Sequence, residues 1–102
     1  MTRIEIRHLK RAIRNSIAAD ATEEDAHRGR ASAIALLEHS IQRRHKRLAV
    51  IRFAAAIRMG ATITHPHWKY CEEAMDSISD DKLRRMVIDA IDGAAENQAS
   101  GL

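Results

Sequence analysis

The stretch from Thr22 to Gly60 decides the fold: TEEDAHRGRASAIALLEHSIQRRHKRLAVIRFAAAIRMG. A helix-start signal lies at its beginning, because either Asp20 with Glu23 or Thr22 with Asp25 can cap a helix whose first turn is acidic. The stretch contains no proline, and its only internal glycine is Gly29. Apolar residues recur at helical spacing, and Gly60 stands where a glycine commonly follows a helix. The pattern predicts one long central helix over about 22–59, which would be roughly 55 Å long at about 1.5 Å per residue.

The second half of this expected helix is unusually apolar. From Leu48 to Met59 it is apolar nearly all round, so it must be covered on several sides. A chain of 102 residues has little else to cover it, and we therefore expect a homodimer built along this helix. The alternative is that the other helices wrap it within one copy. A heptad register, interrupted by Arg44, predicts the interface residues of the dimer: Ile34, Leu37, Ile41, Leu48, Ile51 and Ala55.

Shorter helical patterns flank the central segment. Apolar residues recur at spacings of three and four from Ile6 to Ile17, although alternation near the start also fits a short strand. Pro66 suits the first turn of another helix, and Ser79 is placed to cap the last one. We predict an all-α bundle of about four helices. Residues 1–95 would form a single helical domain and residues 96–102 a flexible C-terminal tail.

Composition narrows the class further. Apolar residues make up 45% of the chain but aromatic residues only 3%, so the core must be aliphatic. Four glycines and one proline are too few for a sandwich or barrel of many short strands. The lone cysteine, Cys71, cannot form an internal disulfide, and neither a signal-peptide pattern nor a long apolar run is present. We expect a cytoplasmic protein with no membrane segment.

The net charge of +3 conceals an uneven distribution. Residues 1–70 contain 14 Lys and Arg against 6 Asp and Glu, whereas residues 71–102 contain 3 against 8. A basic body with an acidic end can bind a polyanion on one side and repel it on the other. An uneven but purely solubilising surface is the alternative interpretation.

The densest basic run is residues 42–47, Gln-Arg-Arg-His-Lys-Arg. A helix would present Arg43, Lys46 and Arg47 side by side, where they could follow a phosphate backbone. The flanking N-terminal helix adds a second basic surface. With few aromatic residues for base stacking, phosphate contact is favoured. We therefore expect a non-catalytic regulator or nucleoprotein subunit that binds DNA or RNA through these residues: Arg43, Arg44, Lys46, Arg47, Arg7, Lys10, Arg11 and Arg14.

Other binding classes compete with this one. The same surface could dock on an acidic or nucleic-acid-binding partner protein, as an adaptor or inhibitor of the kind that phages and plasmids encode. A helix-turn-helix in the last two helices is disfavoured, because Asp80 and Asp81 would meet phosphates. Ile4–Arg7 with the two helical patterns after it resembles a ribbon-helix-helix regulator, which implies a strand at 4–7. A basic amphipathic first helix could also lie on an anionic membrane, although it has no aromatic anchor.

Catalysis and metal binding find little support. The chain has no Gly-rich phosphate loop and no Gly-x-Ser-x-Gly motif, so we expect no enzyme activity and no cofactor. His65, His67 and Cys71 invite a zinc site, but no fourth ligand is signalled nearby. We interpret these residues as helix-start and core positions and expect no metal.

Overall fold

The computed structural model describes the backbone of residues 1–100 and the side chains of residues 1–95. Within that part the chain is entirely helical, as predicted, and has no strand. The helices are α1 (Arg3–Ser16), α2 (Glu23–Gln42), α3 (Lys46–Arg58), α4 (His65–Ile78) and α5 (Asp81–Ser100). Residues 4–7 belong to α1, so the strand of a ribbon-helix-helix is wrong. No helix of the described part is long and apolar enough to cross a membrane.

The predicted long helix over 22–59 is wrong, because the chain turns back after Gln42. Arg44 adopts a left-handed conformation with φ of 57°. The amide of Arg44 donates to the Ile41 carbonyl, and the amide of His45 donates to the Ser40 carbonyl, each at 3.0 Å. This pair of bonds is a Schellman motif, which satisfies the last carbonyls of a helix. It normally uses glycine, and here an arginine takes that position.

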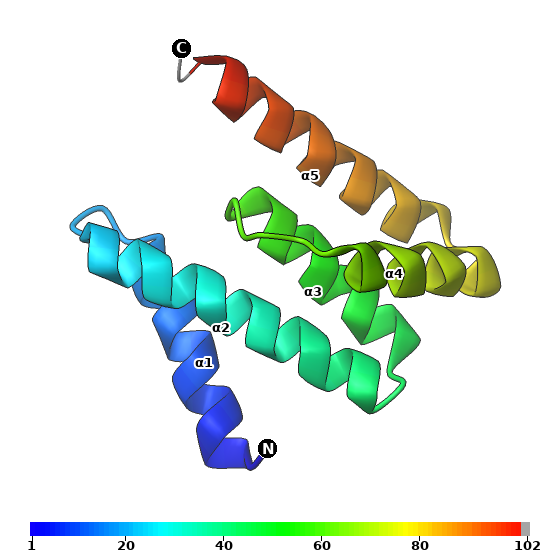
Figure 1. Ribbon diagram of the computed structural model, residues 1–102, viewed down its shortest axis with the longest axis horizontal. Helices are drawn as coiled ribbons and strands as arrows, with labels where there is room; N and C mark the ends of the chain where they lie inside the picture. The colour runs from blue at the N-terminus through cyan, green and yellow to red at the C-terminus, as the bar shows by residue number, and fades with distance from the viewer. Residues whose placement is uncertain (101–102) are drawn as a thin grey trace.

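Because the chain folds back, other helices of the same copy cover the apolar segment. Helix α3 lies at the centre and packs against α2, α4 and α5 (Figure 1). Val50, Phe53 and Ala54 of α3 are fully buried. Phe53 meets Trp68 of α4 edge to face, with ring centroids 4.9 Å apart. The helices of the same chain therefore provide much of the cover that we expected from a second copy.

The predicted dimer-interface residues have several different environments in the single chain. Leu37 is fully buried in the core, where no partner reaches it, and Ile41 packs against that core. Ile34 and Ala55 are half-buried. Only Leu48 and Ile51 remain open, with 37% and 38% of their surfaces exposed. The turn at Arg44 also divides the heptad register between two helices, so no continuous seam exists.

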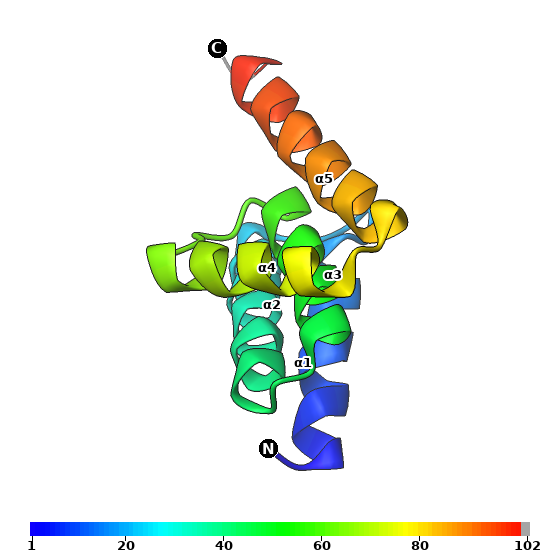
Figure 2. The same cartoon turned by 90° about the vertical axis from the view of Figure 1, so that its right-hand side faces the viewer.

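Helix α1 packs mainly on α2 and buries none of its residues fully. At the crossing, the Ser16 side chain lies directly on Gly29 of α2 and occupies the space that a Cβ atom at position 29 would need. Figure 2 shows α1 extending downward at the N-terminal end of the molecule, with α5 rising away in the opposite direction. The α1 surface therefore remains open to solvent along most of its length.

The remaining helix ends follow the sequence signals, with one shift. Thr22 and Asp25 form the expected capping box, and Gly60, with φ of 76°, follows the end of α3. Ser79 does not cap α5. It ends α4 in a left-handed conformation, and Asp80 accepts the Lys82 amide at 2.9 Å.

The C-terminal part of the chain is more helical than expected. Helix α5 runs through Gly93 to Ser100, so this glycine does not end it. Residues 101–102 of the expected tail lie outside the described residues, and the flexibility of 96–102 stays a prediction.

Candidate nucleic-acid interface

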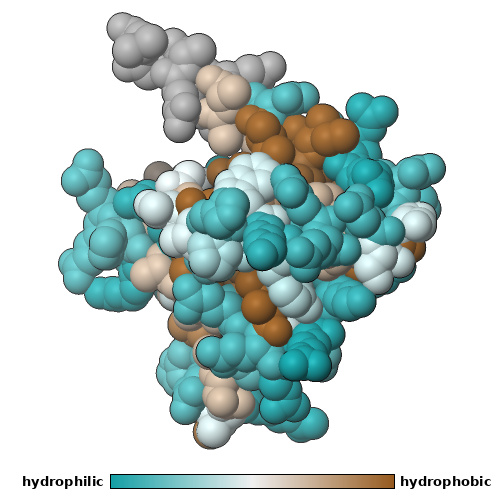
Figure 3. All heavy atoms as spheres, turned by 45° about the vertical axis from the view of Figure 1, so that its right-hand side comes forward, coloured by the Kyte–Doolittle hydropathy of each residue, from teal (hydrophilic) through white to brown (hydrophobic). Residues whose placement is uncertain are grey.

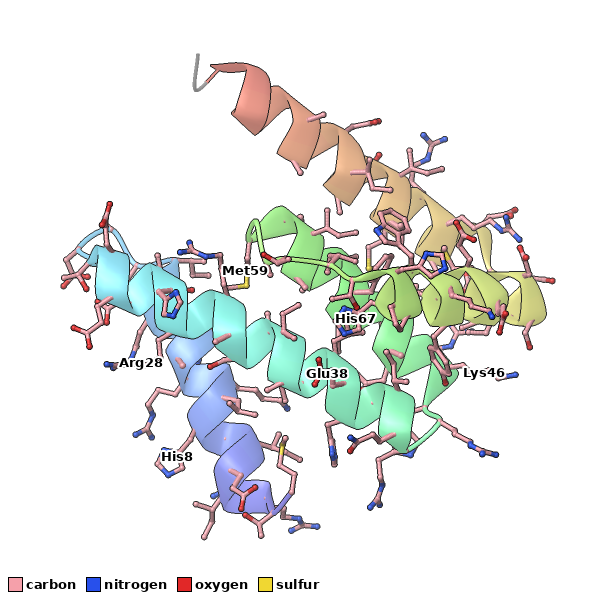
Figure 4. All side chains as sticks on the ribbon, in the orientation of Figure 1. His8, Arg28, Glu38, Lys46, Met59 and His67 are labelled. Atoms are coloured by element: carbon pink, nitrogen blue, oxygen red, sulfur yellow. The ribbon has the colours of Figure 1, made fainter. Side chains whose placement is uncertain are left out.

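All eight predicted phosphate-binding residues are exposed, but they form two groups with different surroundings. Four lie on α1, and four lie in or just after the turn between α2 and α3. Figure 4 shows Lys46 at this turn, on the far side of α2 from the middle of α1. The two groups therefore have to be considered separately.

The α1 group is unengaged. Arg7, Lys10 and Arg14 follow Arg3 at spacings of four, three and four, so they form one stripe along the helix. Among the described residues, no ion pair involves any of the four stripe residues, Arg3, Arg7, Lys10 and Arg14. Arg11 lies beside this stripe and lines a separate hollow with Asp25 and Arg28, among others. Because no carboxylate is paired with the stripe, its charges are available to an external anion.

The turn group is partly engaged within the chain. Lys46 Nζ donates to Ser77 Oγ at 3.0 Å, and Arg47 Nη1 donates to Asp80 Oδ2 at 2.6 Å. These bonds attach the start of α3 to the end of α4 and the start of α5. The expectation that Arg43, Lys46 and Arg47 lie side by side on one helix is therefore wrong. Arg43 and Arg44 are exposed and form no ion pair within the described part.

Asp80 is the acidic residue that organises this corner. Its Oδ1 accepts the amide of Lys82 while its Oδ2 accepts from Arg47. The hydrogen bond from Arg47 lowers the pKa of the Asp80 carboxyl, and the amides of Lys82 and Leu83 lower it further. Asp80, one of the two acidic residues that argued against a helix-turn-helix, thus pairs with Arg47 of the basic run in the same chain.

A second basic cluster was not predicted as a site. A hollow of about 290 Å³ lies where the start of α1, the end of α2 and the first turns of α3 meet. We call it the cationic pocket. Its side chains include no Asp or Glu, and its basic side chains are Arg3, His39, Arg43, His45 and Arg52. Only Arg43 belonged to the predicted set. The others are scattered over fifty positions of sequence, and only the fold-back at Arg44 gathers them.

The electrostatics of the pocket are those of crowded positive charge. Desolvation lowers the pKa of His39, and the Met1 amino group, Arg43, His45 and Arg52 lower it further. Arg52 is half-buried, and burial lowers the pKa of its guanidinium. Its Nε is enclosed and has no hydrogen-bond partner in the described part of the chain. A charge removed from water normally has an oppositely charged partner, and Arg52 has none among the described residues.

Another hollow, of about 470 Å³, lies between α2 and the loop before α4. Figure 4 shows Glu38 and His67 facing each other at its edge, and His67 Nε2 lies 3.2 Å from Glu38 Oε1. The other ring nitrogen, Nδ1, accepts the Thr64 amide at 3.2 Å. Because both nitrogens are occupied, this histidine has none free for a substrate or a metal ion. Its role here is to start α4 and to join it to α2.

Cys71, the cysteine of the zinc site weighed above, is engaged in packing as well. Cys71 is fully buried in the core, and burial raises its pKa to about 12. A buried thiol with a raised pKa is a poor nucleophile at neutral pH. Within the described residues, no three His, Cys, Asp or Glu side chains gather as a metal site.

The candidate site therefore consists of the α1 stripe (Arg3, Arg7, Lys10 and Arg14) and the cationic pocket that it leads into at Arg3. Composition and counting pointed to basic surfaces on α1 and near residue 43. The contribution of His39 and Arg52 depends on the turn at Arg44, which no glycine or proline signalled. No family model, curated protein or solved structure matches this chain.

Proposed function

We propose that this protein is a non-catalytic nucleic-acid-binding protein that contacts phosphates through the α1 stripe and Arg43. The observation that carries the proposal is the unpaired state of the stripe within the described part of the chain. Arg7, Lys10 and Arg14 project from a helix that buries no residue fully, so a duplex or a strand has open access to them. Their role does not require any rearrangement of the core.

The kind of recognition follows from what accompanies the charge. Phe53 and Trp68 pack against each other in the interior, and the third aromatic residue, Tyr70, is half-buried. No aromatic side chain is therefore placed beside the α1 stripe for base stacking. Contacts to phosphates carry little sequence information by themselves. We expect binding that depends strongly on salt and weakly on sequence.

The test is a salt series of binding to random duplex DNA, single-stranded DNA and RNA. The triple variant Arg7→Gln, Lys10→Gln, Arg14→Gln removes three charges from the stripe. A matched control, Lys69→Gln, Lys82→Gln, Arg85→Gln, removes the same charge from exposed positions on α4 and α5. Each lost phosphate contact reduces the slope of log K against log salt by about 0.9 on duplex DNA.

The two variants separate local contact from general charge. The stripe variant should reduce the slope by about two to three and weaken binding to every sequence alike. The control should leave the slope nearly unchanged. The proposal is wrong if the wild-type protein binds none of the three nucleic acids at low salt, or if both variants weaken binding equally.

A second candidate is a protein-binding adaptor or inhibitor, favoured by an apolar surface on α5. Ile88 and Ile91 keep 49% and 37% of their surfaces exposed. In Figure 3, hydrophobic atoms gather over this helix. A partner that docks there would bury these isoleucines, so Ile88→Lys would abolish its binding and leave nucleic-acid binding intact. Association of two copies through Leu48 and Ile51 also stays a prediction, which light scattering tests.

A further inference from the structure

We propose that the cationic pocket binds the terminal phosphate group of a phosphomonoester. The pocket is walled by three helices, so its charges converge on one volume instead of spreading along a surface. This site differs from the α1 stripe, which is an open row of side chains. The proposal does not depend on nucleic-acid binding, because the ligand could be a strand end or a small phosphorylated molecule with the same group.

Charge balance is the first argument. Arg3, Arg43 and Arg52 are permanent cations, and His39 and His45 add two groups that can be protonated. No carboxylate lines the pocket, and no ion pair in the described part involves any of the five. Their mutual repulsion raises the free energy of the empty pocket. A dianion relieves more of this repulsion than the single charge of a bridging phosphodiester.

Hydrogen bonding is the second argument. Arg52 lies half-buried with its Nε–H unpaired, although a guanidinium offers five donors suited to phosphate oxygens. The Ser40 hydroxyl, which also lines the pocket, donates to the Leu36 carbonyl at 3.0 Å and forms no hydrogen bond with Arg52 Nε. Helix α3 also begins at this pocket with no side-chain cap from His45. The side chains that line the pocket therefore offer more donors than acceptors and include no carboxylate.

Shape is the third argument. Ile6, Leu36 and Leu48 provide apolar walls from three different helices. A volume of about 290 Å³ is enough for a phosphate together with part of the group that carries it. An end group enters such a pocket with its charged oxygens first and leaves the rest of the ligand outside.

The test uses the full chain with inorganic phosphate, measured by calorimetry and by thermal unfolding. Arg52→Met keeps most of the side-chain volume and removes the charge. Arg3→Gln is a second variant at an exposed position on α1, so it does not depend on the core. Arg58→Met is the matched control, because it removes an exposed arginine from the same helix outside the pocket.

We expect phosphate to bind the wild-type protein and to raise its melting temperature. Arg52→Met and Arg3→Gln should each weaken binding by about tenfold or more, whereas Arg58→Met should not. Without phosphate, Arg52→Met should melt at or above the wild-type temperature, since it removes an unpaired charge. Absence of phosphate binding to the wild-type protein overturns the proposal, and so does equal weakening by Arg58→Met.

Two oligonucleotides identify the source of the phosphate. A strand with a 5′-phosphate should bind more tightly than its 5′-hydroxyl counterpart if the ligand is a strand end, and inorganic phosphate should compete for that difference. Equal binding of the two strands, together with a positive phosphate titration, assigns the pocket to a small phosphorylated ligand. If the oligonucleotides bind but inorganic phosphate neither binds nor competes with them, the pocket does not bind phosphate. Nucleic-acid binding by the α1 stripe would then remain supported.

Discussion

Ser16 of α1 lies so close to Gly29 of α2 that a Cβ atom at position 29 would overlap the Ser16 side chain. The hydroxyl of Ser16 is turned back onto the Ile13 carbonyl of its own helix. This contact fixes α1, and with it the α1 stripe, at the far end from the cationic pocket. It explains a glycine inside a helix, where that residue is ordinarily unfavourable.

We expect Gly29→Ala to destabilise the protein by about 1–3 kcal/mol, because overpacking outweighs the gain in helix propensity. Gly93→Ala is the control, since a Cβ there meets nothing within 4 Å. That variant should gain up to about 1 kcal/mol. Urea unfolding of both variants measures the difference. A Gly29→Ala protein as stable as Gly93→Ala would show that α1 does not rest on this contact.

The left-handed turn at Arg44 gives a second prediction. Glycine adopts this conformation without the steric cost that a side chain carries, so Arg44→Gly should stabilise the fold by about 1 kcal/mol. If residues 22–59 formed one continuous helix, the same substitution would instead destabilise the protein by about 1 kcal/mol, because glycine is a poor helix former. Chemical unfolding of Arg44→Gly beside Arg44→Ala distinguishes the two. The alanine variant controls for loss of the charge.

A third prediction concerns Asp80, which both caps α5 and accepts from Arg47. Asp80→Asn keeps a capping side chain and loses the ion pair, whereas Asp80→Ala loses both. Melting temperatures should fall in the order wild type, Asp80→Asn, Asp80→Ala, and Asp89→Ala on the exposed side of α5 should stay near wild type.

The same carboxyl gives this prediction a pH dependence. Its pKa is lowered in the folded chain, so its stabilisation is present above the ordinary Asp pKa and disappears as the pH falls through the lowered value. The melting difference between wild type and Asp80→Ala should therefore shrink in acid. A difference that stays constant down to acid pH would contradict the ion pair.

A fourth prediction concerns the pH dependence of anion binding in the cationic pocket. The pKa of His39 is lowered by desolvation and by the positive charges of the Met1 amino group, Arg43, His45 and Arg52. Arg3 also lines the pocket and adds a further positive charge to it. An anion would offset those charges and raise the pKa, so binding takes up a proton. Affinity for sulfate, which stays divalent, should therefore increase as the pH falls through the ordinary histidine range near about 6.5.

His39→Asn should flatten this pH profile, and His8→Asn, which lies outside the pocket on α1, should leave it unchanged. Calorimetry with sulfate at several pH values provides the measurement. If the affinity is independent of pH in the wild-type protein, His39 takes no part in anion binding.

Much of the local structure was readable from short signals. The capping box at Thr22, the glycine after α3 and the proline in α4 each mark a helix end by a mechanism that acts within a few residues. The break at Arg44 has no such signal. It arises because α3 is apolar on several sides and gains more by packing on α2, α4 and α5 than by extending into solvent. That balance involves distant residues, which periodicity along one segment does not reveal.

The same reason limits what the sequence says about the site. Counting charges located the basic surface on α1, which stays unpaired in the described part of the chain. Counting did not reveal that Arg47 would be engaged by Asp80, thirty-three positions away. Counting also did not show that Arg3 and Arg52 line the same pocket, because that pocket forms only when the helices pack together.

The reversal of the chain at Arg44 has a consequence for how the basic run should be dissected. Five consecutive residues that look like one tract serve two separate sides of the protein: Arg43 and His45 border the cavity, while Lys46 and Arg47 fasten the helices of the acidic half. Neutralising all five residues together would remove pocket charges and helix-joining contacts at once. A loss of ligand binding could then not be distinguished from a loss of folding. Single replacements at Arg43 or His45, made separately from those at Lys46 or Arg47, would keep recognition and folding experimentally apart.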